Sequence, residues 1–343
     1  MSIPSKWLDA SQEHTFTVEM IDPWNLEKSR GELRGITSAS VTYGYDSDTK
    51  VSASLETYDD NYKKGSWLRF KVDGTEIGTF GVQSKTVKEN EERSYSLQSV
   101  LWMLQNDLAY QLYTVRANCK ASQAIKTICK VVRKSVVFNP GHGDYMYKKA
   151  VAWSRTDSYL SILKDLCSIS SNQLGVDPHG RITISRYVPP KNKTARYSLD
   201  TSVTRGVVLS PGFSDDDQYG DVVNRTVVVS SGNNDEADIV GYFDHTEISN
   251  TRGWVKTEVH QVSDMSPRTQ KRAEQLAKQY SAEDSDTGVT RDVSTIYFPL
   301  DAGDIVTWDN DWWLGRKYLV QTIDCDFLNW TMKLTLKEVS TSG

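Results

Sequence analysis

The chemistry open to this chain is limited by the placement of its histidines. None of them stands at the HxH or HxxxH spacing of zinc ligands, and the sequence has no GxSxG elbow, P-loop or dinucleotide-binding fingerprint. His142 is the most site-like, because it stands in the glycine-rich loop Gly141–Asp144, but no second ligand or nucleophile stands beside it. We therefore expect no catalytic residue, no cofactor and no enzyme activity. The five histidines are His14, His142, His179, His245 and His260.

The cysteines show neither a CxxC pair nor the spacing of a disulfide framework. A free cysteine packs as a small hydrophobic residue. Cys167 follows Leu163 and Leu166 on an apolar helical stripe, which predicts a buried and unreactive thiol. We predict that all four cysteines, Cys119, Cys129, Cys167 and Cys325, are reduced core residues.

Aspartates gather in two places, and carboxylate oxygens are ligands for hard cations. Neither cluster has the spacing of an EF-hand loop. We therefore interpret both clusters as solvated loops and predict no metal site. One cluster is Asp215, Asp216, Asp217 and Asp221, and the other is Asp301, Asp304, Asp309 and Asp311.

A pair of tryptophans, Trp312 and Trp313, stands in the polar turn between Asp309 and Gly315. An exposed pair of this kind can bind another subunit or provide a platform for a sugar. Alternatively, one ring closes the end of the surrounding β-structure and the other lies along its surface. We keep both interpretations and name Trp312 and Trp313 as a candidate assembly contact.

Length and composition exclude several classes of protein. A chain of 343 residues is long enough for roughly two or three domains with cores of their own. The net charge of −5 argues against stable binding to nucleic-acid phosphates. No run approaches the roughly 20 apolar residues of a membrane helix, and no basic and apolar leader opens the sequence. We expect neither a membrane span nor Sec export.

The first segment alternates apolar and polar residues around Val18, as half-buried strands do. An Asp-Gly turn predicts a hairpin between Trp67–Val72 and Ile77–Val87. Several short strands at this spacing predict a small antiparallel barrel or a sandwich, and we take the barrel. The apolar stripe Leu97–Leu112 has helical spacing and predicts an exit helix, so residues 1–112 form the first predicted domain.

The middle segment mixes helices and strands. Apolar stripes predict one helix over Ala121–Val132 and another that is capped by Thr156. Leu174–Val176 and Arg181–Tyr187 flank an Asp-Pro-His-Gly turn and predict a hairpin. Residues 113–200 are therefore predicted to form an α/β insert. The first of these two helices is predicted to end with three cationic residues, which suit a helix C-terminus that is exposed to solvent. They are Lys130, Arg133 and Lys134.

The third segment, residues 201–343, is again rich in strands. A helix is predicted to begin at Ser266-Pro267, because proline suits the first helical position. Met332, Leu334 and Leu336 point to one side of the last strand, as in a barrel wall. We predict an α+β fold, mainly β, with two small antiparallel β-barrels of similar topology that flank the α/β insert. The predicted strands are Asp221–Val229, Trp254–Val262, Val289–Phe298, Tyr318–Asp326 and Trp330–Val339.

In this order of parts the chain resembles the bacteriophage tail hub proteins, the baseplate-hub or tail-tip family often called minor tail proteins. The likeness covers nearly the whole length, and it is carried by the pattern of strands rather than by a signature. The matching runs are Trp67–Val72 through Phe80–Val82, Trp153–Thr156 with Tyr159–Leu163 through Gly180–Ile184, and Pro299–Val306 through Tyr318–Val320.

The resemblance implies a homotrimeric ring at the tail tip of a virion, made and assembled in the host bacterial cytoplasm. Two barrels in each of three chains would offer six near-equivalent positions to a six-fold tail tube. The implied partners are the tail tube protein, distal tail protein, tape measure protein and tail fibre or other tip proteins, with transient DNA passage through a central channel. The alternatives are a hexameric distal tail ring protein, and a cell-wall hydrolase or carbohydrate-binding tail protein that uses His142 or Trp312.

Overall fold

Strands make up most of the regular structure of this chain. The computed structural model describes residues 3, 7, 13–109, 113–200, 207–210, 223–231, 237–244, 253–262, 269–284, 290–309 and 316–339. The chain divides into two compact units, Met1–Phe213 with Asp292–Leu336 and Ser214–Arg291 with Lys337–Gly343. The predicted α+β, mainly β, class is confirmed. The division into three domains stays a prediction.

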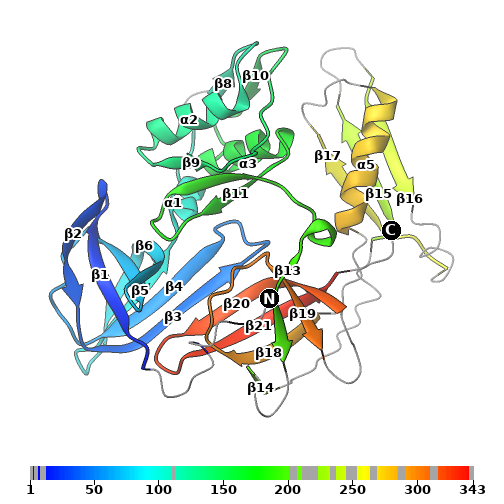
Figure 1. The fold of residues 1–343 in the computed structure, drawn as a ribbon. Helices are drawn as coiled ribbons and strands as arrows, with labels where there is room; N and C mark the ends of the chain where they lie inside the picture. Colours follow the sequence, from blue (N-terminus) through cyan, green and yellow to red (C-terminus); the bar gives the residue numbers. More distant parts are fainter. Residues whose placement is uncertain are drawn as a thin grey trace. The chain divides into compact units, whose positions relative to one another are not determined.

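Seven strands of the N-terminal segment form the first part of a large sheet (Figure 1). Asp73 and Gly74 have φ values of 49° and 73°, and positive φ at both positions is what a two-residue hairpin turn between twisted strands requires. They join β5 to β6, which confirms the predicted hairpin. The strands are β1 (Phe16–Asp22), β2 (Asn25–Leu33), β3 (Ile36–Gly44), β4 (Val51–Thr57), β5 (Trp67–Val72), β6 (Thr75–Val87) and β7 (Arg93–Gln98).

The C-terminal strands join the same sheet. One half of β20 (Arg316–Asp326) pairs antiparallel with β19 (Ile305–Asp309), and the other half pairs antiparallel with β3. Thirteen strands belong to this sheet, and no closed barrel is found among the described strands. The predicted pair of barrels is therefore not confirmed. The remaining strands are β13 (Ala195–Asp200), β14 (Val208–Ser210), β18 (Thr290–Ile296) and β21 (Thr331–Glu338).

One apolar core lies between the two groups of strands. Val41 of β3 and Phe70 of β5 are buried in it together with Trp308 of β19 and Tyr318 of β20. Complete burial of a valine or phenylalanine side chain contributes roughly 1.5–3 kcal/mol. The two ends of the chain thus stabilise each other. The predicted inward side of β21 is confirmed, because Met332, Leu334 and Leu336 are all buried.

The insert has a second core of its own, formed around three helices. The helix α1 (Val100–Asn106) is shorter than the predicted helix over Leu97–Leu112, which was wrong at both ends. Leu97 belongs to β7 and packs in the first core. It is apolar because a strand buries it there, and not because it belongs to the helix. The Ser99 hydroxyl accepts a hydrogen bond from Leu101 N–H at 3.3 Å and starts the helix after the strand.

The second and third helices lie where the apolar stripes of the sequence predicted them, but the residue that caps the third helix differs from the prediction. The predicted N-cap of α3 (Tyr159–Ile169) was wrong, since the Ser158 hydroxyl and not Thr156 accepts a hydrogen bond from Ser161 N–H, at 3.1 Å. No described helix is long and apolar enough to cross a membrane. The other elements are α2 (Ala121–Val131), the predicted hairpin of β11 (Asn172–Val176) and β12 (Ile182–Arg186), β9 (Val136–Phe138) parallel to β12, and β8 (Tyr113–Val115) paired with β10 (Val151–Trp153).

A buried arginine fixes the β11–β12 turn to the large sheet. Arg69 of β5 donates hydrogen bonds to Glu76 Oε1 at 2.8 Å and to Thr79 Oγ1 at 3.0 Å. The Thr79 hydroxyl donates in turn to the carbonyl oxygen of Pro178 at 2.7 Å, and His179 Nδ1 lies 2.5 Å from Glu76 Oε2. The position of the insert therefore depends on a polar network around one guanidinium as well as on apolar packing.

In its described residues, the second unit consists of a three-stranded sheet with one helix packed on it (Figure 1). Ala273, Leu276 and Ala277 of the helix pack against Val228 of the central strand. A Cβ on Gly241 would lie 2.3 Å from the backbone of Ala273, so only glycine fits under the helix at this position. The predicted helix start at Ser266-Pro267 lies outside the described residues. The elements are β15 (Arg225–Ser230), β16 (Ile239–Asp244), β17 (Thr257–Gln261) and α5 (Gln270–Asp284).

The network around Arg69 predicts a specific loss of stability. Thr79→Val keeps the shape of the side chain but leaves Arg69 Nε–H and the Pro178 carbonyl without their partner, at a cost of about 2 kcal/mol. Urea denaturation followed by circular dichroism measures the change. Thr75→Val at the exposed start of β6 is the matched control. Equal stability of the two variants would contradict this account of the contact.

Candidate interaction surface

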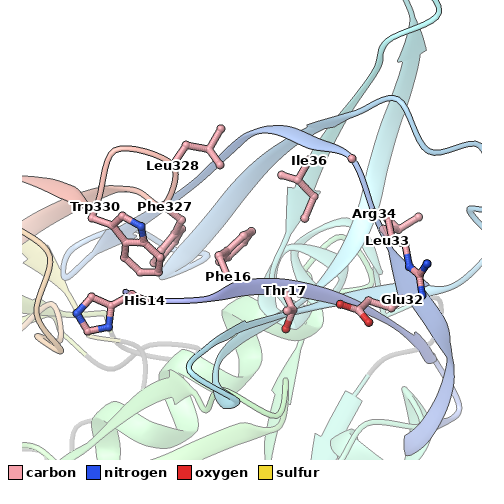
Figure 2. A pocket seen from close by; sticks show the side chains of 11 residues that line it. His14, Phe16, Thr17, Glu32, Leu33, Arg34, Ile36, Phe327, Leu328 and Trp330 are labelled. Atoms are coloured by element: carbon pink, nitrogen blue, oxygen red, sulfur yellow. The ribbon is translucent and has the colours of Figure 1, made fainter. Parts of the chain in front are cut away.

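Three segments of the large sheet surround an open groove of about 470 Å³ (Figure 2). They are the entry to β1, the β2–β3 turn and the β20–β21 turn, so the pairing of β3 with β20 brings both ends of the chain to one place. Phe16, Ile36 and Phe327 give the groove apolar walls, and Glu32 and Arg34 add opposite charges. The remaining lining residues are His14, Thr17, Leu33, Gly35, Leu328 and Trp330.

Aromatic contacts fix the shape of this groove. Phe16 stacks on Phe327 with ring centroids 4.9 Å apart, and Trp330 lies 5.3 Å from the ring of His14. His14 also stacks on Trp7 at 4.5 Å, and its Nδ1 lies 2.8 Å from a carboxylate oxygen of Asp73. The imidazole is therefore held by its neighbours. The shape of the groove is therefore fixed within the chain, and the histidine that lines it already has a partner.

The cysteines lack the environment of a nucleophile. Cys129, Cys167 and Cys325 are buried, and burial raises the pKa of Cys129 and Cys167 to about 12. The predicted burial of Cys167 is confirmed. The prediction that all four cysteines are reduced core residues holds only in part for Cys119, a free thiol in the turn that leads into α2, which is partly buried and packs against the core of the insert.

One carboxyl group outside the groove has a raised pKa. Partial burial of the Asp165 carboxylate in α3 disfavours its charged form and raises its pKa, although the indole N–H of Trp153 donates a hydrogen bond to it at 2.9 Å. This contact ties β10 to α3. Within the described ranges, no three His, Cys, Asp or Glu side chains are grouped so that they could hold a metal ion.

Trp24 is the most exposed large apolar side chain of the described residues, at 70%. It lies in the β1–β2 turn, where its backbone N–H donates to Asp22 Oδ1 at 2.9 Å. The cationic groups of Arg133 and Lys134, at the end of α2, lie 5.8 and 5.7 Å from the centre of its ring. An exposed indole that is held in place in this way is the kind of side chain that dominates protein interfaces.

Lys130 and Arg133 are exposed, as the interpretation of the α2 C-terminus as a solvated helix end expects, but Lys134 departs from it. The Lys134 ammonium group lies 4.3 Å from the ring centroid of Trp67, and burial lowers its pKa. Its position between two indoles was not visible from a charge pattern. The sequence does contain a signal for Trp24, because a large aromatic residue stands in the turn Asp22-Pro23-Trp24-Asn25, where a polar residue is usual.

Where they are described, the residues predicted from the sequence are not brought together into one site. Trp312 and Trp313 lie outside the described residues, as do the first aspartate cluster and Asp311. His142 Nδ1 lies 3.0 Å from the carbonyl oxygen of Asn139, and its ring lies 5.0 Å from that of Phe138. The loop is therefore ordered by local contacts.

Two aspartates of the second cluster, Asp301 and Asp304, form ion pairs with Arg196, while the Asp301 side chain stays 76% exposed to solvent. Arg196 Nη1 lies 2.6 Å from Asp301 Oδ2 and 2.5 Å from Asp304 Oδ2. Burial alone would lower the pKa of Arg196, but the two carboxylates outweigh it and raise the pKa. The positive charge of Arg196 takes the place that a cation would need between these aspartates.

Solved structures of tail proteins match this fold over nearly the whole chain. The tail protein of Neisseria meningitidis MC58 has a TM-score of 0.70 at 13% identity, over 94% of this chain and 96% of that one. The 43 kDa tail protein of prophage MuSo2 from Shewanella oneidensis has a TM-score of 0.68 at 14% identity, over 94% and 98%. This chain has the fold of phage tail proteins.

A third tail protein extends the comparison. The prophage tail protein gp18 of Listeria monocytogenes EGD-e has a TM-score of 0.60 at 11% identity, over 94% of each chain. No protein-family model and no curated protein matches the sequence. At such low identity these tail proteins establish the fold, and they confirm the resemblance that the order of the parts indicated.

The burial of the cysteines predicts their reactivity. With a pKa of about 12, Cys129 and Cys167 are thiolates in roughly one molecule in ten thousand at pH 8, and their position excludes reagent. We predict that iodoacetamide labels Cys119 first in the folded protein, as read by peptide mass spectrometry. Urea-unfolded protein is the control, in which all four cysteines label at similar rates. Rapid labelling of Cys167 in the folded chain would contradict this assignment.

Proposed function

We propose that this chain is a structural hub protein of a bacteriophage tail tip or baseplate. The observation that carries the proposal is the fold shared with tail proteins over 94% or more of each chain. The buried thiols, the paired His14 and the ion-paired aspartates support a structural rather than an enzymatic role. Its place is then the tail of the virion, after assembly in the host cytoplasm.

Three copies form a ring in this proposal. Each chain contributes two β-rich halves, β1–β7 and the C-terminal strands, which act as two barrel-like positions. Three chains then offer six positions to a six-fold tail tube. The pairing of β3 with β20 supports this arrangement, because it holds the two halves at a fixed spacing in one sheet.

The centre of the ring is a channel through which DNA passes without remaining bound. The net charge of −5 supports this part of the proposal, because acidic residues on a channel wall repel phosphates. Stable nucleic-acid binding is not expected.

The outer surfaces of the hub contact other tail proteins. Trp24 and the groove at Phe16 and Phe327 support such contacts, because they offer an exposed indole and a preformed hollow. Trp312 and Trp313 remain a proposed assembly contact. The expected partners are the tail tube, distal tail, tape measure and tail fibre or other tip proteins.

Counting the copies tests the ring. The purified chain, measured by native mass spectrometry over a range of concentrations, is expected to show a species of three copies. Negative-stain images of that species are expected to show three-fold symmetry with a central hole. A hexamer would favour a distal tail ring protein, and a monomer at all concentrations would contradict the hub.

A further inference from the structure

The predicted insert, residues 113–200, is strongly basic although the whole chain is acidic. It contains 15 lysines and arginines, five aspartates and no glutamate, which gives it a net charge of +10. The rest of the chain has 25 lysines and arginines and 40 acidic residues, a net charge of −15. No acidic residue stands between Arg116 and Asp144. A charge separation of this size within one chain indicates a binding surface for an anionic partner.

Four of these cations follow α2 and its C-terminal turn, and we name them the basic row. Lys126 and Lys130 stand four residues apart, so they lie on the same side of the helix, and both are exposed. Among the described residues, no member of the row forms an ion pair with a carboxylate. The basic row is therefore open to an anion from another molecule. Its members are Lys126, Lys130, Arg133 and Lys134.

The basic row ends at an exposed aromatic ring. The cationic groups of Arg133 and Lys134 lie 5.8 and 5.7 Å from the ring centre of Trp24, which is 70% exposed. Tryptophan and arginine are enriched among the residues that dominate the binding energy of protein interfaces. The surface thus offers an apolar platform beside positive charges.

The turn that ends α2 holds Arg133 in a conformation that glycine adopts more easily. Its φ is 54°. Arg133 N–H donates to the Lys130 carbonyl oxygen at 3.2 Å, and Lys134 N–H donates to the Cys129 carbonyl oxygen at 2.8 Å. These two bonds form a Schellman motif, in which glycine is the usual residue at the position of Arg133. An arginine there strains the backbone, and backbone strain of this kind is concentrated at functional positions.

The helix dipole explains only part of this arrangement. It favours cations in the last turn of a helix. Lys126 lies more than one turn before the end of α2, and its ammonium group lies 5.3 Å from the ring centre of Phe138. Like charges four residues apart, such as Lys126 and Lys130, destabilise a helix. A bound anion reduces that repulsion.

We infer that the basic row and Trp24 bind an acidic segment of another protein, which under the proposed hub function is another tail protein. Cations one helical turn apart are separated by about 6 Å along the axis of α2. Alternate residues of an extended chain are about 6.6 Å apart on one side of that chain. An extended segment with acidic residues at alternate positions therefore places its carboxylates opposite successive cations, and an apolar residue of the segment covers the indole.

A nucleic acid fits this surface less well. Duplex DNA carries one negative charge per about 1.7 Å, and it extends far beyond the row. Residues 1–112, which include Trp24 and the strands of the large sheet that precede the insert, have 12 lysines and arginines and 17 acidic residues. A long polyanion meets that net negative charge as well as the row, whereas a short acidic segment contacts the row alone.

Fluorescence anisotropy of labelled peptides measures this binding to the full-length chain. The probe is a short fluorescein-labelled peptide with glutamate at alternate positions and one central leucine, and the control peptide has glutamine in place of each glutamate. We expect the glutamate peptide to bind about tenfold more tightly than the glutamine peptide or better, because only its charges complement the row. Added NaCl is expected to weaken the binding of the glutamate peptide.

Substitutions in the surface separate binding from folding. Arg133→Gly removes the guanidinium and relieves the positive φ, so we expect the affinity for the glutamate peptide to fall about threefold or more while the midpoint of urea denaturation stays equal or rises. Trp24→Ala, at an exposed turn, is expected to weaken binding in the same direction. Lys191→Ala is the matched control, since it removes one exposed cation outside the row and should leave the affinity unchanged.

The outcomes separate this contact from the hub itself. Equal binding of the two peptides would contradict the acidic partner, as would an unchanged affinity in both Arg133→Gly and Trp24→Ala. If a single-stranded oligonucleotide binds the parent chain more tightly than the glutamate peptide and loses its affinity in the same variants, the surface is a nucleic-acid site and the inference is overturned. The hub stands or falls separately, by the number of copies in the purified particle.

Discussion

The rest of the structure depends on the antiparallel pairing of β3 with β20. This pairing joins residues as far apart in sequence as Thr42 and Asp324, whose side chains are hydrogen bonded at 2.7 Å across 282 positions. Closing a chain segment of that length costs roughly 5 kcal/mol of entropy. Burial of Val41, Ile323 and Cys325 along the same two strands offsets this cost. The core between the two β-rich halves exists only when this pairing has formed.

The features that support an assembly role follow from that constraint. The turn at Phe327 comes to lie beside Phe16 because β20 is fixed to β3, and the groove of Figure 2 is formed where they meet. The insert is then held on β5 and β6 by the network around Arg69. Apolar packing and paired charges fill these regions. The groove and the exposed Trp24 are the features on which the proposed assembly role rests.

Local patterns in the sequence predicted much of this fold. Alternation gave the inward side of β21, and an Asp-Gly turn gave the β5–β6 hairpin, because both depend on neighbouring residues. The pairing of β3 with β20 has no local signal, so the two halves were predicted as separate barrels. The environments of Lys134 and Trp24 also depend on distant residues, and neither was predicted. The apolar stripe that begins at Leu97 predicted a helix that starts too early, because Leu97 lies in β7 and is buried in the first core.

We propose that this chain is a structural part of the tail end of a virion. Cryo-electron microscopy of phage particles from the host that encodes the chain tests this placement. We expect density that fits the large sheet and its insert as three copies around the axis at the tip end of the tail tube. Particles that lack the chain, or that carry it elsewhere than in the tail, would overturn the proposal.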